Sequence, residues 1–301
     1  MTARPIGLGN AGEVRRLALA DGRVLSYTTY GAPEGRPVLA LHGTPGSRLK
    51  FRFMDAAARR RGLRLVCPDR WGYGGSDRHP APSLVAYAED MAALCDGLGL
   101  DRVGLIGISG GGPYATAVAA RLGSRVTGLA LVSPVGPIAE ARHGLGLRFI
   151  QWLAFRVVHR LGPVLAALLG VFRQAIRHWP AAGMWIAFVA AARVDREAVA
   201  RPDVGGGLLA TFQEGFLTSA GGMVADVRIF STRWGFDIAG VTVPSRVWIG
   251  TVDTNVPVQA AIGLARQLPR AELVTLAGEG HLWVFEHHDE VLAWLEARAA
   301  D

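Results

Sequence analysis

The stretch best suited to chemistry is Gly107-Ile108-Ser109-Gly110-Gly111, a serine with glycine two residues to either side. An apolar run over residues 103–108 predicts a strand buried on both faces, and residues 112–120 predict a helix. A sharp turn between strand and helix lifts the serine hydroxyl above the sheet edge, and it needs glycine where the chain doubles back. The helix start also directs free N–H groups and positive charge toward that point. The pattern therefore predicts Ser109 as a nucleophile.

A serine nucleophile needs a base, and the base needs an acid that orients it. Asp253 follows an apolar run that predicts a strand over residues 243–249, and His281 follows the next predicted strand. Taken singly, Asp253 would serve equally as a helix cap and His281 as an ordinary loop histidine. Three such residues, each just past a strand end, favour a Ser109–His281–Asp253 triad. Asp237 is a weaker alternative acid because it lies further from a strand end.

Attack on a carbonyl creates an oxyanion, which two preorganised N–H donors must stabilise. Gly110 follows the nucleophile and supplies one backbone N–H. Thr44 follows His42-Gly43 at the end of another predicted strand and supplies the second, since Pro45 has no N–H. We therefore expect the N–H groups of Thr44 and Gly110 to form an oxyanion hole.

The elements that must position these residues alternate between apolar strands and helices up to residue 132. This alternation predicts a mostly parallel, doubly wound α/β sheet with helices on both faces. Residues 134–236 contain no convincing buried strand and predict several helices, after which the alternation resumes. We therefore expect an α/β core over residues 1–133 and 237–301, with a helical cap inserted between these two parts.

Five segments together resemble the α/β-hydrolase superfamily over essentially the whole chain: His42-Gly43, the 69–77 loop, Gly107–Gly111, Asp253 with Val256-Pro257, and Gly280-His281. The resemblance implies the α/β-hydrolase fold and the chain order Ser109, Asp253, His281 for the triad. It also implies a structural role for Asp69, which braces its loop. Superfamily members that are haloalkane dehalogenases or epoxide hydrolases carry aspartate at the position of Ser109, so these two activities are not expected.

Composition excludes other classes of protein. The net charge is +7, but Lys50 is the only lysine and the arginines are spread along the 301 residues, so we expect no nucleic-acid partner. Residues 7–12 match G-x-G-x-x-G but follow no strand, which argues against a dinucleotide site. No His, Asp and Cys residues have metal-ligand spacing, so we expect no metal and no cofactor. Cys67 and Cys95 are expected to be buried free thiols.

These features predict a serine hydrolase that cleaves a carboxylic ester of a small hydrophobic substrate through an acyl-enzyme. Trp283 and Phe285 follow the base closely and are expected to contact substrate. The same machinery would also suit an amide, thioester, lactone or C–C bond, including aminopeptidase-like activity, and the fold would suit a non-catalytic ligand receptor. A lipid enzyme acting at an interface is a third alternative, although we expect the cap helices to bury their apolar faces on the core and to make no membrane contact. The chain start has no signal-peptide pattern, so we expect a cytoplasmic protein of undetermined oligomeric state.

Overall fold

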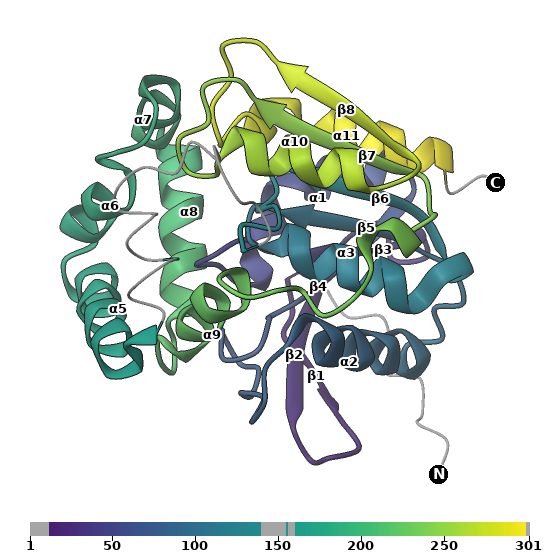
Figure 1. The fold of residues 1–301 in the computed structure, drawn as a ribbon, viewed down its shortest axis with the longest axis horizontal. Coiled ribbons are helices and arrows are strands. Elements are labelled where there is room, and N and C mark those ends of the chain that lie inside the picture. Colours follow the sequence, from purple (N-terminus) through teal and green to yellow (C-terminus); the bar gives the residue numbers. More distant parts are fainter. Residues whose placement is uncertain (1–11, 140–154, 156–159, 299–301) are drawn as a thin grey trace.

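The computed structural model describes residues 12–139, 155 and 160–298. Eight strands form one sheet in the order β1-β2-β4-β3-β5-β6-β7-β8 (Figure 1). Strands β1, β2 and β4 pair antiparallel, and every other neighbouring pair is parallel. The strand bounds are β1 Arg15–Ala18, β2 Val24–Gly31, β3 Arg36–Leu41, β4 Leu63–Pro68, β5 Val103–Ile108, β6 Val126–Val132, β7 Ser245–Gly250 and β8 Ala271–Leu276.

The central strand β5 is buried at all six of its residues, as its unbroken apolar run predicts. It lies between β3 and β6, and Leu105 is paired with Leu39 on one side and Leu129 on the other. At the edge of the sheet, Asp21-Gly22 turns β1 back onto β2 in an antiparallel hairpin. The chain therefore has the predicted α/β fold with a mostly parallel sheet.

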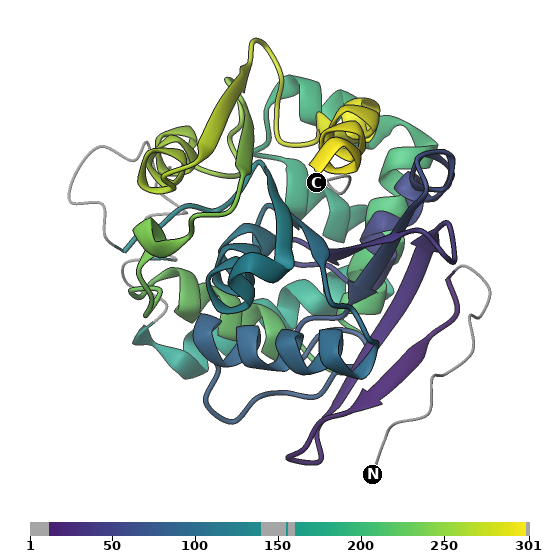
Figure 2. The ribbon, with the colours of Figure 1, turned by 90° about the vertical axis from the view of Figure 1, so that its right-hand side faces the viewer.

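Helices cover both faces of the sheet (Figure 2). Apolar side chains of α2, α3 and α10 form a core with one face, and those of α1 and α11 form a second core with the other. Between β3 and β4 the chain forms a 3-10 segment, η1, and then the short helix α1. The bounds are η1 Arg48–Met54, α1 Asp55–Arg60, α2 Leu84–Gly97, α3 Gly111–Leu122, α10 Val258–Gln267 and α11 Val284–Arg298.

Five described helices lie between β6 and β7 in the chain and form a separate group beside the sheet (Figure 1). We call this group the helical insertion. The prediction that this part of the chain is helical is confirmed where the structure describes it, while its division from the core at residues 134 and 236 stays a prediction. The bounds are α5 Gly162–His178, α6 Pro180–Phe188, α7 Arg193–Ala200, α8 Pro202–Gly215 and α9 Gly221–Phe230.

The insertion buries only part of its apolar surface. Leu165 and Ile176 of α5 are buried, and Ile176 packs in a cluster with Phe212 of α8. By contrast, Trp179 and Trp185 are each 65% exposed. The expectation that these helices bury their apolar faces on the core is therefore wrong for a substantial part of α5 and α6.

Several smaller predictions can also be assessed. Cys67 and Cys95 are buried and free, as expected. The glycine motif of residues 7–12 lies outside the described residues except for Gly12. Within the described residues, no helix is long and apolar enough to cross a membrane.

Candidate active site

Ser109 lies in the turn between β5 and α3, with a positive φ of 54° that side-chain-bearing residues rarely adopt. The neighbouring glycines make this turn possible. A Cβ on Gly107 would lie 2.7 Å from the Cβ of Ala115, and a Cβ on Gly111 would lie 2.2 Å from the carbonyl oxygen of Leu41. The backbone N–H of Ser109 is bound to the Val132 carbonyl at 2.8 Å. The turn is therefore fixed by steric fit and by a bond to the next strand.

Asp253 and His281 come together at the ends of β7 and β8. The Nδ1 of His281 and the Oδ2 of Asp253 are 2.7 Å apart, and the Asp253 side chain is fully buried. The other carboxylate oxygen accepts the N–H groups of Asn255 and Val256, at 2.8 and 3.0 Å. These bonds hold the carboxylate in one orientation, and the carboxylate in turn sets the ring orientation of His281.

The alternative acid, Asp237, does not contact the histidine. Its carboxylate accepts the N–H of Ala239 and begins the short 3-10 turn Ile238–Gly240, ahead of β7. A parallel strand brings its carboxyl end, not its amino end, to the edge where β5 and β8 also end. The geometry therefore favours Asp253 over Asp237 as the partner of His281.

The protonation of His281 is set by competing effects. Burial lowers the pKa of His281, and Lys50 lowers it further, but the carboxylates of Asp253 and Asp195 outweigh both, so that its pKa is raised. With Nδ1 directed at Asp253, the Nε2 atom of His281 has no hydrogen-bond partner among the described residues. The Oγ of Ser109 likewise makes no hydrogen bond to the described part of the chain.

The two predicted oxyanion donors lie next to each other. A Cβ on Gly110 would fall 2.2 Å from the Oγ1 of Thr44, so only glycine fits beside this side chain. Neither the Thr44 N–H nor the Gly110 N–H donates to an acceptor in the described residues. Two free N–H groups close to a serine are what an oxyanion hole requires.

A buried ion pair fixes the position of Thr44. Asp226, on α9 of the insertion, accepts from both terminal nitrogens of Arg70 at 2.5 and 2.8 Å, and both residues are about 1% exposed. The Thr44 hydroxyl donates to the same carboxylate at 2.5 Å. The phenols of Tyr73 and Tyr114 also donate to it, each at 2.6 Å, and burial raises the pKa of both.

A second carboxylate of the insertion supports the histidine loop. Asp195, on α7, is 1% exposed and accepts the backbone N–H groups of His281 at 3.0 Å and Leu282 at 2.8 Å. Gly280 is needed for this approach, because a Cβ there would lie 2.5 Å from the Oδ1 of Asp195. The insertion therefore contributes to positioning both His281 and Thr44, one of the two predicted oxyanion donors.

The other buried histidine, His42, is structural. Its Nε2 accepts the backbone N–H of Arg70 at 3.0 Å, and its Nδ1 lies 2.9 Å from the Gly43 carbonyl. Burial keeps the pKa of His42 well below the ordinary value. Asp69 is also fully buried; its carboxylate binds Ser26, Arg48 and the N–H of Gly75, so the expected bracing role is confirmed.

Among the described residues near the site, Lys50 carries a side-chain ammonium with no opposite charge paired to it. It lies in η1, is 9% exposed, and makes no hydrogen bond or ion pair through Nζ within the described residues. Its Nζ lies 4.3 Å from the centre of the Phe285 ring, in a cation–π contact. Burial lowers the pKa of Lys50 to about 7.

The predicted substrate contacts of Trp283 and Phe285 stay predictions. Trp283 is 3% exposed, donates through its indole N–H to the Ser133 hydroxyl at 3.1 Å, and packs in the core beside Trp248. Phe285 is only partly buried and faces the ring of Phe53 and the ammonium of Lys50. Of the two, Phe285 has the better position for contact with a bound molecule.

No group of three or more His, Cys, Asp or Glu side chains in the described ranges is placed to hold a metal ion.

A family model described as the alpha/beta hydrolase fold matches residues 36–288 of this sequence. The chain belongs to this family.

Two relatives that this chain matches are named as hydrolases. It is 26% identical to the 2-hydroxymuconate semialdehyde hydrolase of Pseudomonas putida over 292 residues, which is 94% of this chain and 93% of that protein. It is 35% identical to the 2-hydroxy-6-oxo-2,4-heptadienoate hydrolase of Pseudomonas putida over 142 residues, only 44% of this chain and 49% of that protein. Among solved structures, a bromoperoxidase from Bacillus anthracis has a TM-score of 0.73 at 19% identity, covering 96% of this chain and all of that one, which supports the fold alone.

Sequence reasoning did not identify Asp195, Asp226, Arg70 or Lys50 as parts of this site. A weak signal exists for Asp226, the one carboxylate within the Gly221–Phe230 helix, whose only other charged residue is Arg228. Its four partners come from three separate segments of the core, and nothing in the spacing connects them.

Proposed function

We propose that this α/β hydrolase cleaves carboxylic esters through an acyl-enzyme on Ser109. The observation that carries the proposal is the His281–Asp253 contact of 2.7 Å at the sheet edge where Ser109 turns. It leaves Nε2 of His281 without a partner in the described chain, which is the state a general base needs.

In the proposed reaction, the Ser109 oxygen bonds to the acyl carbon while His281 takes the serine proton. The carbonyl oxygen gains negative charge and is stabilised by the N–H groups of Thr44 and Gly110. The ester C–O bond then breaks, and the alcohol leaves with the proton held by His281. Water, deprotonated by the same histidine, attacks the acyl carbon and releases the acid and Ser109.

Apolar side chains beside the histidine support a hydrophobic substrate. Leu282 packs with Phe188, Phe212 and other apolar residues of the insertion, and Phe285 lies at the edge of that cluster. An acyl chain bound along such a surface would gain about 0.8 kcal/mol for each methylene that it buries.

Labelling with a fluorophosphonate probe tests the nucleophile. We expect one covalent adduct per chain, located on Ser109 by peptide mass spectrometry, and none in Ser109→Ala. Ester turnover should fall by roughly 10⁴–10⁶ in that variant. An adduct on another residue, or unchanged turnover in Ser109→Ala, would refute the assignment.

A second candidate function is hydrolysis of a C–C bond next to a carbonyl in a substrate that carries a carboxylate. Two observations favour it: the near full-length similarity to a hydrolase named for a muconate semialdehyde, and the unbalanced Lys50 ammonium beside Phe285. Comparison of a neutral ester with the same ester carrying a terminal carboxylate tests this choice. If the enzyme prefers the ester with the terminal carboxylate, and if this preference is lost in Lys50→Met, the second candidate is favoured.

A further inference from the structure

The outer helices of the insertion expose an unusual amount of apolar surface. Eight of the fourteen most exposed large hydrophobic side chains of the described chain lie between residues 161 and 189, where α5 and α6 pack against each other. These helices lie at the left-hand edge of the view in Figure 1, with α8 and α9 between them and the sheet. We define six of these side chains as the apolar face: Val164 (48% exposed), Leu168 (56%), Val171 (69%), Trp179 (65%), Trp185 (65%) and Ile186 (48%).

A basic cleft adjoins this apolar face. It has a volume of about 1000 Å³ and lies between α5, α9 and the loop at residues 78–82. Val171 and Trp179 belong both to the apolar face and to the lining of the cleft. Three arginines line the cleft, and neither Asp nor Glu does: Arg78, Arg173 and Arg228.

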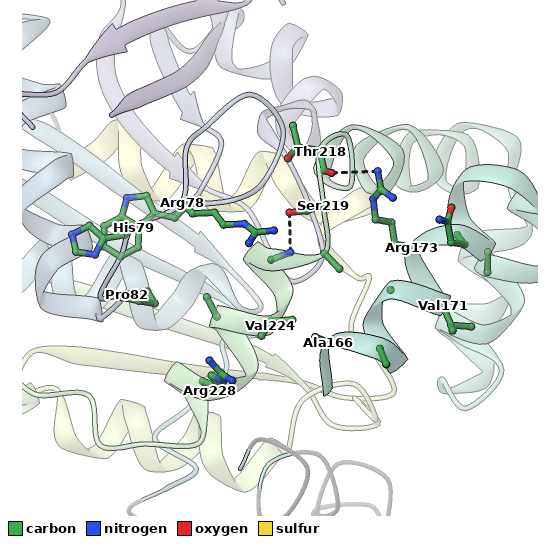
Figure 3. A pocket seen from close by; sticks show the side chains of 18 of the residues that line it. Arg78, His79, Pro82, Ala166, Val171, Arg173, Thr218, Ser219, Val224 and Arg228 are labelled. Atoms are coloured by element: carbon green, nitrogen blue, oxygen red, sulfur yellow. Dashed lines mark hydrogen bonds between the residues drawn. The ribbon is translucent and has the colours of Figure 1, made fainter. Parts of the chain in front are cut away.

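The arginines approach the cleft from different elements (Figure 3). Arg173 donates to the carbonyl oxygens of Phe216 at 2.9 Å and Thr218 at 3.4 Å, so a neutral partner holds it in place. The side chains of Arg78 and Arg228 make neither an ion pair nor a hydrogen bond with any described residue. None of the lining residues belongs to the proposed triad or oxyanion hole, so the cleft is a separate feature.

The surrounding sequence does not neutralise this charge. Residues 160–192, which include α5 and α6, contain three arginines and no Asp or Glu. A second copy of the chain, docked through the apolar face by two-fold symmetry, would bring the two basic clefts close together. The like charges of the two copies would then repel each other. An anionic lipid surface offers the opposite charge together with an apolar interior. Tryptophan side chains at the boundary, as at positions 179 and 185, are typical of segments that lie in a membrane interface.

We propose that the apolar face docks this hydrolase onto bilayers that contain anionic phospholipid. In the docked state, the apolar side chains lie among the acyl chains, and a headgroup phosphate binds at the arginine cleft. Docking of this kind places α5 and α6 in the interface without any segment crossing the bilayer.

Vesicle flotation tests the proposal, using the full chain carrying Ser109→Ala so that binding is measured independently of catalysis. We expect the protein to float with vesicles of phosphatidylcholine plus phosphatidylglycerol and to bind at least about tenfold less to phosphatidylcholine alone, which corresponds to ~1.4 kcal/mol. Val171→Asp should reduce binding about tenfold, and Arg78→Gln with Arg228→Gln should remove the preference for phosphatidylglycerol. Leu273→Asp is the matched control: Leu273, on β8, is 40% exposed and belongs neither to the apolar face nor to the lining of the cleft, so its variant should bind like the parent.

Circular dichroism and the Tm of each variant show whether it is folded. The proposal would be overturned if the protein bound neither kind of vesicle. It would also be overturned if Val171→Asp and Leu273→Asp lost binding equally. Light scattering without lipid tests whether a second copy of the chain, instead of a membrane, covers the apolar face. A dimer that Val171→Asp dissociates would assign the apolar face to self-association and would also overturn the proposal.

Discussion

The carboxylate of Asp195 is bound to the backbone N–H of His281 at 3.0 Å, although Asp195 lies 86 residues earlier, on helix α7. The same carboxylate accepts the N–H of Leu282. It therefore acts on the histidine in two ways: it fixes the position of the loop, and its charge contributes to the raised pKa of His281.

Asp195→Asn is predicted to lower kcat and to shift the pH profile. The amide accepts one N–H but opposes the second with its own NH₂ group, so the loop is held less firmly. Loss of the charge lowers the pKa of His281, and because the base acts in its neutral form, the acid limb of kcat/KM should move to lower pH. The measurement is kcat/KM between pH 5 and pH 9. Asp203→Asn, at a carboxylate 69% exposed on α8, should leave the profile unchanged. A drop in activity with an unmoved acid limb would mean that Asp195 acts on stability alone.

Asp253→Asn is predicted to lower kcat by about 10⁴, because an amide no longer holds His281 in the tautomer that accepts a proton at Nε2. Asp237→Asn should reduce kcat less than threefold or so, since that carboxylate only begins a short turn. Steady-state kinetics of both variants on one ester distinguishes them. If Asp237→Asn were the inactive variant, the acid would have been assigned to the wrong end of β7.

Asp226→Ala is predicted to destabilise the fold by about 3–5 kcal/mol, because Arg70 would remain buried without its counter-charge. Urea unfolding measures the change. Arg70→Met combined with Asp226→Leu should lose less stability than Asp226→Ala, since neither charge is then left alone. If the double variant lost as much stability as Asp226→Ala or more, the two charges would not be coupled in the folded protein.

Lys50→Met is predicted to stabilise the protein at neutral pH by on the order of 1–3 kcal/mol. The folded-state pKa of Lys50 is about 7, against 10.5 when exposed, so the unfolded chain binds more protons between these values. Stability of the parent should therefore rise as pH increases from about 7 to about 10, and fall toward acid until the penalty is complete below pH 7. The advantage of Lys50→Met should be largest below pH 7 and disappear near pH 10.5. Urea unfolding across this range checks it; a pH-independent difference would point to packing instead of charge.

Lengthening the acyl chain of the ester is predicted to raise kcat/KM by up to about fourfold for each methylene buried. This factor corresponds to a binding free energy of ~0.8 kcal/mol per methylene. A series of aryl esters of increasing acyl length gives the slope, and a prolyl arylamide is the comparison. A prolyl arylamide preferred over every ester would indicate an aminopeptidase.

The parts of the site that the sequence predicts are those set by local structure. Ser109, Asp253 and His281 each follow a strand whose apolar run is visible in the sequence, and parallel strands bring their ends to one edge. Asp195 and Asp226 were not predicted because a carboxylate on a helix usually faces solvent, and only the packing of the insertion on the core buries these two. The burial of α5 was predicted wrongly for a related reason. The spacing of its apolar residues predicts an apolar face, but it does not indicate which part of the protein covers that face.

The two buried carboxylates of the insertion have a consequence for exchange of parts between relatives. Here Asp226 holds Thr44 of the proposed oxyanion hole, and Asp195 holds the loop of His281. A chimera that carries the insertion of another enzyme of this fold would therefore lose turnover on every substrate, including the substrate of the enzyme that donated the insertion. Turnover would be kept only if the insertion also carried acids at these two positions.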